Sequence, residues 1–195
     1  AMNIRVSRSV IPALSEPQLV YALIDLNCTG EPDPSKLPSA SICLVIDRST
    51  SMKGERIEMV KSNILQLIKH LKPNDMICIV AFSDRAEVIV PPTRASELVK
   101  VESRINQLEI FGSTELFRGL ETGVAMLRRT SETTLIRHLI LMTDGHTYGD
   151  EEECLKLARA AEQENISMSA MGIGSEWNDA FLDKLVSISG GTTVY

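Results

Sequence analysis

Five oxygen-bearing side chains occur in three separated stretches of this sequence, each next to an apolar run or a helical pattern. Two of the stretches follow the apolar runs 42–46 and 139–142, and the third precedes a helical pattern. The carboxyl ends of strands in an open α/β sheet lie along one edge, where ligands bind. Oxygen donors without paired His or Cys suit a hard cation, so we predict a site for Mg²⁺, Mn²⁺ or Ca²⁺. The predicted ligands are Asp47, Ser49, Ser51, Thr114 and Asp144.

The hydroxyl groups in this set also have a simpler explanation. Serine at a junction between a strand and a helix most often caps the helix that follows. Ser49 and Ser51 could do this, and Thr114 could cap its own helix. The pattern Asp-x-Ser-x-Ser alone occurs by chance in roughly one of twenty chains of this length. The preceding buried strand, the following helix and two further loops of matching chemistry favour the metal site for the set as a whole.

Three motifs, in this order, resemble those of the von Willebrand factor type A domain family with a complete metal-ion-dependent adhesion site. They are Asp47-Arg-Ser-Thr-Ser-Met-x-Gly54, Thr114 and Thr143-Asp-Gly145, and the wording Asp-Arg-Ser is common among bacterial members. The resemblance runs from about residue 39 to residue 195. It departs at Thr50, where many members carry Gly, but that position is not a ligand in the family.

The resemblance implies a role for each predicted ligand. In the family's partner-binding state, the serine and threonine hydroxyls contact the cation directly, and the two Asp residues act largely through water. The cation then accepts an Asp or Glu carboxylate from a partner protein. We therefore expect a protein-interaction or adhesion module without catalytic activity. The expected partner-binding rim consists of residues beside the site loops: Arg48, Lys53, Glu55, Glu115, His146, Tyr148 and Asp150.

Two other functions are also compatible with the sequence. A Mg²⁺-dependent phosphoryl-transfer hydrolase could use Asp47 as its nucleophile, but such enzymes need an acid two residues later, where this chain has Ser49. A structural interaction domain could also work without a metal. The intact set of five oxygen donors argues against that alternative, because such a domain has no reason to keep them.

The composition of the chain bears on its possible partners, its possible metal and its cellular compartment. The net charge of −6 argues against a nucleic-acid partner, and no apolar run is long enough to span a membrane. Four cysteines without a Cys-x-x-Cys pair make a zinc site improbable. Unpaired cysteines within apolar strands favour a reducing, cytoplasmic compartment, although the ends resemble those of an excised domain and leave the compartment open. We expect a monomeric domain of a larger protein.

Strand and helix patterns alternate from residue 39 onward, which predicts an α/β fold. We expect a three-layer, doubly wound (Rossmann-like) and mostly parallel sheet with helices on both faces. The run 76–82 is apolar on both faces, as in a central parallel strand. The run 86–90 follows after a turn too short for a parallel crossover, so it predicts an antiparallel edge strand, closed by Pro91 and Pro92.

The first part of the chain has a different character. Residues 1–38 predict an N-terminal β extension and a proline-rich linker, and residues 39–195 predict the type A domain. The extension is too small to fold alone. An accessory hairpin and a fragment of a β-sandwich are both compatible with it.

Overall fold

The computed structural model describes residues 2–8, 10–13, 16–26, 38–99, 101–130, 136–144, 149–174 and 178–194. The chain divides into two units, residues 1–37 and residues 38–195. In the first unit, β1 (Met2–Val6) pairs with β2 (Ala22–Leu26) as an antiparallel hairpin. Ile4 lies opposite Ile24, and the pairs two residues away are also apolar, so one face of the hairpin is apolar. A hairpin of this size has little stability of its own.

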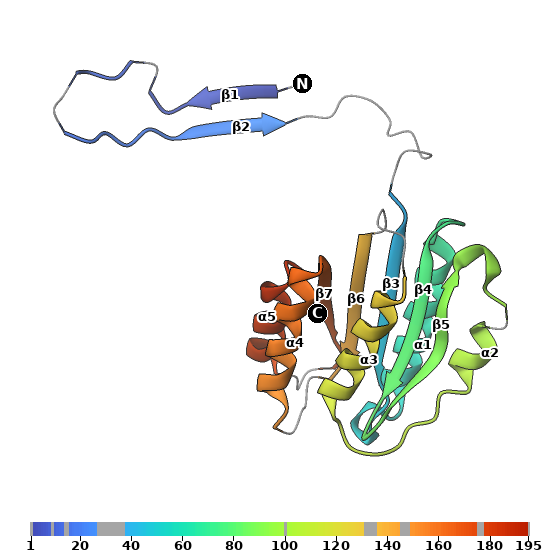
Figure 1. Cartoon of the computed structure of the whole chain (residues 1–195). Helices are drawn as coiled ribbons and strands as arrows, with labels where there is room; N and C mark the ends of the chain where they lie inside the picture. The colour runs from blue at the N-terminus through green and yellow to red at the C-terminus, as the bar shows by residue number, and fades with distance from the viewer. Residues whose placement is uncertain are drawn as a thin grey trace. The chain divides into compact units, whose positions relative to one another are not determined.

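A six-stranded sheet forms the centre of the second unit (Figure 1). Its strand order is β5-β4-β3-β6-β7-β8, and only β5 runs antiparallel, at one edge. The chain winds outward in both directions from the pair β3 and β6, which makes this pair the switch point where ligands bind in such sheets. The strands are β3 (Ala40–Asp47), β4 (Met76–Phe82), β5 (Ala86–Arg94), β6 (Ile136–Thr143), β7 (Ile166–Gly172) and β8 (Thr193–Val194).

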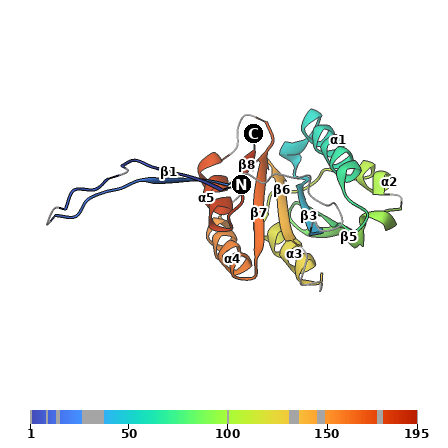
Figure 2. The same cartoon turned by 90° about the horizontal axis from the view of Figure 1, so that it is seen from above.

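Helices cover both faces of this sheet (Figure 2). One face carries α1 (Glu55–His70) and the short α2 (Val101–Asn106), and the other carries α3 (Leu116–Arg128), α4 (Glu151–Gln163) and α5 (Asp179–Ile188). Successive residues of β3 point to opposite faces of the sheet, and each face has its own hydrophobic core. Val45 packs in the core with α3, α4 and α5, and Leu44 packs in the core with α1 and α2. The expected three-layer α/β fold with one antiparallel edge strand is confirmed.

The edge strand β5 extends beyond its expected end, and helix α2 is short. β5 continues through Pro91 and Pro92 to Arg94. Proline is tolerated there because an edge strand leaves part of its backbone unpaired, and the β4–β5 register shifts around Ile79. Helix α2 is only six residues long, and Val99 lies outside it with 71% of its surface exposed.

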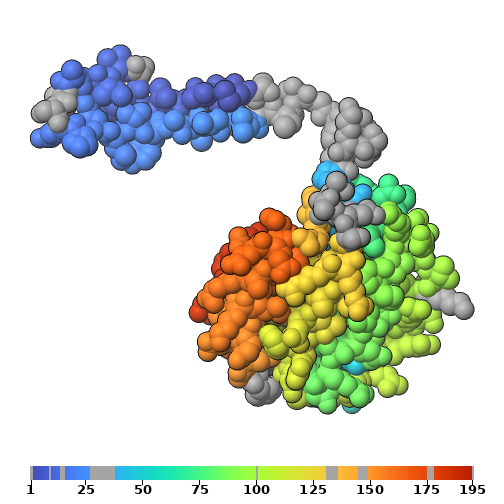
Figure 3. Space-filling model, in the orientation of Figure 1, coloured from blue at the N-terminus to red at the C-terminus, as the bar shows by residue number. Residues whose placement is uncertain are grey.

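Helix α3 lies unusually close to the sheet. A Cβ atom at Gly119 would lie 2.6 Å from the Phe82 ring, and one at Gly123 would lie 2.6 Å from Val45 Cγ2. These glycines let the helix backbone approach the strands directly. The space-filling view shows α3 and α4 side by side over this face of the second unit (Figure 3). No helix in the described part of the chain is long and apolar enough to cross a membrane.

Candidate metal centre

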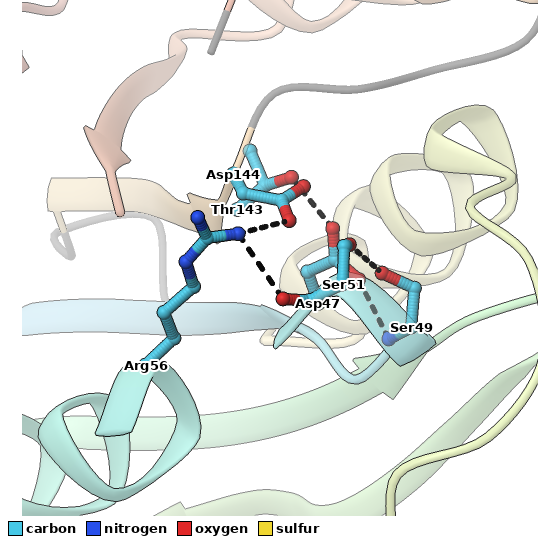
Figure 4. Close-up of polar contacts among 6 residues, drawn as sticks. All are labelled: Asp47, Ser49, Ser51, Arg56, Thr143 and Asp144. Carbon is cyan, nitrogen blue, oxygen red and sulfur yellow. Dashed lines mark hydrogen bonds and ion pairs between the residues drawn. The ribbon is translucent and has the colours of Figure 1, made fainter. Parts of the chain in front are cut away.

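The first part of the site is made by two neighbouring strand ends. β3 ends at Asp47 and β6 ends at Thr143, and the parallel register places Ile46 beside Met142. The next residue pair therefore brings the Asp47 carboxylate to Thr143, whose hydroxyl donates to Asp47 Oδ2 at 2.7 Å (Figure 4). Both side chains are fully buried. Strand pairing thus fixes the carboxylate at the switch point of the sheet.

The loop after β3 supplies two hydroxyls. The Ser49 backbone N–H donates to Asp47 Oδ1 at 2.8 Å, and the hydroxyl oxygens of Ser49 and Ser51 lie 2.9 Å apart (Figure 4). Neither serine caps a helix. The short 3-10 helix after Ser49 and the helix after Gly54 both lack a side-chain cap. Helix capping therefore does not account for these hydroxyls.

Asp144 follows β6 and completes the acidic part of the site. It is 1% exposed, and its Oδ2 accepts a hydrogen bond from Arg56 Nη1 at 3.3 Å. The same Arg56 nitrogen donates to the Ser51 carbonyl at 3.1 Å. Asp144 Oδ1 is enclosed without a partner among the described residues. A buried acceptor left unpaired costs about 1–3 kcal/mol, and more when charged, so a bound cation would relieve this cost.

The electrostatics of the site also favour a cation. Burial raises the pKa of Asp47 above its ordinary value, and the nearby Asp144 raises it further. Hydrogen bonds from Ser49 and Thr143 lower that pKa and offset part of the burial effect. Of these two buried carboxylates, that of Asp144 pairs with a partly exposed guanidinium, that of Arg56. The donor set of acids and hydroxyls fits a hard divalent cation.

Thr114 lies in a separate loop that is hydrogen-bonded to the loop after β3. The Phe111 N–H donates to the Arg48 carbonyl at 3.1 Å, and the Thr50 N–H donates to the Gly112 carbonyl at 3.3 Å. Thr114 is 5% exposed, and α3 begins after Glu115 without a side-chain cap. Within the described residues, the Thr114 hydroxyl makes no hydrogen bond to the other four predicted ligands.

The structure thus gathers Asp47, Ser49, Ser51 and Asp144 into one cluster, and it ties the Thr114 loop to that cluster. In the ranges that the structure describes, no three His, Cys, Asp or Glu side chains gather in a way that could hold a metal ion. The candidate site contains only two such side chains. Its other donors are hydroxyls.

The predicted rim residues differ in their environments. Lys53, Glu55 and Glu115 are exposed beside the site loops. Arg48 is not an exposed rim residue, because it is 4% exposed and pairs with Glu87. Asp150 is half-buried, and its Oδ2 accepts a hydrogen bond from the Phe117 N–H at 2.7 Å, near the start of α3. The two remaining rim candidates, His146 and Tyr148, lie outside the described residues.

Two residues that contact the predicted ligands were not among the residues predicted for the site. Thr143 is the last residue of its strand, and only the strand register shows that its hydroxyl meets Asp47. Arg56 gave a weak signal, because a basic residue in the first turn of a helix opposes the helix dipole. Its contact with Asp144 joins residues 88 positions apart, which no local pattern reveals.

Replacing Arg56 with Gln is expected to raise the affinity of the domain for Mg²⁺. The guanidinium competes with a cation for Asp144 Oδ2, so its removal should tighten binding about two- to fivefold, or ~0.5–1 kcal/mol for a partly exposed pair. Calorimetric titration with MgCl₂ measures this change. Arg159→Gln, on the exposed surface of α4, is the control for the lost charge. Unchanged or weaker binding in the Arg56 variant would show that Arg56 does not compete.

Comparison with known proteins agrees with this architecture. The sequence profile of the von Willebrand factor type A domain matches residues 41–195. The chain belongs to this family. Type A domains are typically adhesion and protein-interaction modules, and they are generally non-enzymatic. The family resemblance that the three motifs predict is therefore confirmed for the domain.

The type A domain of this chain is similar to parts of longer proteins. It is 31% identical over 156 residues to the uncharacterized protein sll0103 of Synechocystis sp., covering 80% of this chain and 37% of that protein. It is 27% identical over 172 residues to inter alpha-trypsin inhibitor heavy chain 4 of Mus musculus, covering 81% and 18%. The chain therefore spans well under half the length of either relative.

A solved structure shows the same fold. Proximal thread matrix protein 1 from the mussel byssus, with a zinc-occupied metal-ion-dependent adhesion motif, superimposes with a TM-score of 0.64 at 21% identity. The match covers 80% of this chain and 41% of that chain.

Proposed function

We propose that this type A domain binds a divalent cation and uses it to capture an acidic side chain of a partner protein. The observation that carries the proposal is the unpaired Asp144 Oδ1, which is buried next to a second carboxylate and a pair of serine hydroxyls that cap no helix. This arrangement is unfavourable without a cation and favourable with one. The proposed ligands are Asp47, Ser49, Ser51, Thr114 and Asp144.

The chemistry of the donors limits the choice of cation. Oxygen donors alone suit Mg²⁺, Mn²⁺ or Ca²⁺, and the zinc in the adhesion motif of the mussel protein supports a divalent site in this fold. When bound, the cation supplies an electrophilic centre that a carboxylate of the partner can complete. The protein holds Asp47 in place through the Ser49 N–H and the Thr143 hydroxyl, and it places the two serine hydroxyls 2.9 Å apart beside that carboxylate, where both can act as ligands.

A catalytic role for Asp47 has less support. Both of its oxygens accept hydrogen bonds, from the Ser49 N–H and from the Thr143 hydroxyl, which hold the carboxylate in place rather than exposing it as a nucleophile. The position two residues later holds Ser49, which cannot act as the general acid that such enzymes need. An interaction domain that ignores metal also has less support, because it would retain the cost of the unpaired Asp144 oxygen.

The relatives support an interaction role within a larger protein. This chain corresponds to a minor part of sll0103 and of the inhibitor heavy chain. We infer a monomeric domain whose exposed rim residues Lys53, Glu55 and Glu115 contribute to the choice of partner. The partner is expected to present an Asp or Glu side chain.

Calorimetry with MgCl₂, MnCl₂ and CaCl₂ tests the cation site. The unmodified domain is expected to bind one cation, and the double variant Ser49→Ala/Ser51→Ala is expected to bind it at least about tenfold more weakly. Ser187→Ala, an exposed serine on α5, is the matched control. Absence of binding by the unmodified domain would contradict the proposal.

Peptide capture tests the acidic partner. Immobilised peptides with a single Glu should retain the domain in MgCl₂ and release it in EDTA, and matched peptides with Gln should not retain it. Retention that is equal with Glu and Gln would contradict carboxylate recognition. Metal-dependent hydrolysis of p-nitrophenyl phosphate by the domain, lost in Asp47→Asn, would favour the enzyme instead.

A further inference from the structure

A cavity of about 390 Å³ lies beside the loops of the proposed metal site. Its wall is formed by residues from three segments: the loop after β3, the start of β5, and the stretch from α2 to the Thr114 loop. The charged and aromatic residues that line it are Arg48, Arg85, Glu87, Arg104, Glu109 and Phe111. Arginine is the commonest residue type among them. None of the five proposed ligands lines the cavity, so it is separate from the metal site.

Arg48 is the buried member of this group. Its guanidinium carbon lies 4.3 Å from the centre of the Phe111 ring, and its Nη2 donates to Glu87 at 2.9 Å. Its Nε–H is enclosed without a hydrogen-bond partner among the described residues, although the side chain is only 4% exposed. A buried charged donor without an acceptor is costly. A negatively charged ligand in the cavity would stabilise this guanidinium.

Two further arginines add positive charge to the same wall. The Arg85 guanidinium carbon lies 5.2 Å from the Phe111 ring centre, so two guanidinium groups share one aromatic ring. Arg85 makes no ion pair with any described residue. Arg104 Nη1 donates to the backbone carbonyl of Ile89 at 3.2 Å, which neutralises no charge. The cavity is therefore a positively charged site on a chain whose net charge is −6.

The formal charge of the residues that line the cavity indicates which class of anion it can bind. Three arginines and two glutamates line the cavity, which gives it a formal charge of +1. A carboxylate carries a single negative charge and fits this balance, and guanidinium groups bind carboxylates through paired N–H donors. A phosphate dianion would leave the cavity with a net negative charge, whereas a carboxylate leaves it neutral. We propose that this cavity binds a second acidic side chain of the partner protein, next to the one that the metal site captures.

The position of Arg48 links the two sites. It stands between Asp47 and Ser49, so its Cα is about 3.8 Å from the Cα of each. A carboxylate at Arg48 and one at the cation would therefore lie close enough to come from a single acidic segment. This inference rests on the proposed function for the identity of the partner. The binding of a carboxylate in the cavity does not depend on a metal and can be tested separately.

The first experiment uses the protein stripped of metal with EDTA and then dialysed into metal-free buffer without chelator, so that the metal site cannot contribute. N-acetyl-glutamate N-methylamide is titrated while ¹H–¹⁵N NMR follows the arginine Nε–H signals. The Arg48 Nε–H signal is expected to shift in a saturable way. The variant Arg85→Gln/Arg104→Gln should weaken binding at least about fivefold, whereas Arg118→Gln/Arg159→Gln, with the same change in charge elsewhere on the surface, should not.

Several outcomes of this experiment would overturn the cavity proposal. The first is a shift that does not saturate, and the second is equal weakening in both double variants. A third is tighter binding of inorganic phosphate than of the glutamate derivative. Arg85 and Arg104 are exposed, so the variant should fold normally, and equal thermal midpoints of the two double variants verify this.

The second experiment separates this proposal from the proposed function. Peptides with one Glu or with two Glu separated by a short glycine linker are titrated in MgCl₂. The two-Glu peptide is expected to bind at least about tenfold more tightly, and this advantage should disappear in Arg85→Gln/Arg104→Gln. An advantage that persists in that variant would overturn the cavity proposal. Binding that is unchanged by EDTA but still needs the arginines would support the cavity and contradict the metal-bridged function.

Discussion

Asp47→Asn is expected to make the metal-free domain more stable while it removes most of the cation affinity. Asp47 is 0% exposed, and the Asp144 carboxylate nearby repels it. Asn keeps the shape and still accepts the Ser49 N–H, and its amide N–H can donate to the Thr143 hydroxyl. The variant therefore loses the buried charge without losing the hydrogen bonds. Cation affinity should fall about 10- to 100-fold, as it does when groups that orient a metal site are replaced.

The sign of the stability change follows from the pKa of Asp47. Its folded-state pKa is raised, chiefly by burial, so the folded state disfavours the ionised form. The stability contributed by the protonated form is present below the ordinary pKa of 3.8 and is lost as the pH rises through the raised value. Asn has no ionisable group at this position, so the stability of the variant does not fall in this way as the pH rises. Its advantage in the free energy of unfolding, measured by urea titration in EDTA, should be largest at neutral pH and vanish near pH 3.

Asp75 is a matched control for this experiment. It is also buried, but it accepts hydrogen bonds from two backbone N–H groups, those of Ala40 at 2.9 Å and Lys72 at 2.7 Å. An amide N–H of Asn would face one of these donors, so Asp75→Asn should destabilise the domain and leave cation affinity unchanged. If Asp47→Asn also destabilises the metal-free domain, removing the buried charge does not outweigh the other effects of the substitution.

Much of the fold could be predicted because its signals are local. The runs 42–46 and 76–82 are apolar on both faces, which is the pattern of strands covered by helices on both sides. The short turn before Ala86 allowed only an antiparallel partner, which the structure confirms. The continuation of β5 past two prolines was missed, because it depends on the edge position of the strand rather than on its residues.

The candidate site also contains residues that local patterns could locate and residues that they could not. Asp47 and Asp144 stand where apolar runs end, so their positions followed from the sequence and the architecture together. Arg56 and the burial of Arg48 did not, because both depend on where long side chains point after the loops fold. A local pattern places Arg48 beside the site, but its stacking on Phe111 joins residues 63 positions apart (111 − 48). Such contacts determine the electrostatics of the site, and the hydrophobic periodicity of the sequence does not reveal them.

Gly119→Ala is expected to destabilise the domain by about 1–3 kcal/mol, although the same change within a helix usually stabilises by ~1 kcal/mol. The added Cβ would lie 2.6 Å from Cγ and Cδ1 of Phe82, which is itself 0% exposed and cannot move away. Urea unfolding measures the loss, and Glu121→Ala, exposed on the same helix, is the control. Greater stability of the Gly119 variant would show that α3 tolerates the extra volume.

The same substitution connects packing with the site. Phe82 precedes Ser83, whose carbonyl accepts the Glu115 N–H at 2.8 Å at the start of α3. Moving α3 away from Phe82 would strain this bond and shift the neighbouring Thr114, so Mg²⁺ affinity should fall together with stability. Adding Phe82→Leu, which shortens the obstructing side chain, should recover part of both losses, because residues in contact have non-additive effects. Additive losses in the double variant would place the cause of the Gly119 effect somewhere other than the contact with Phe82.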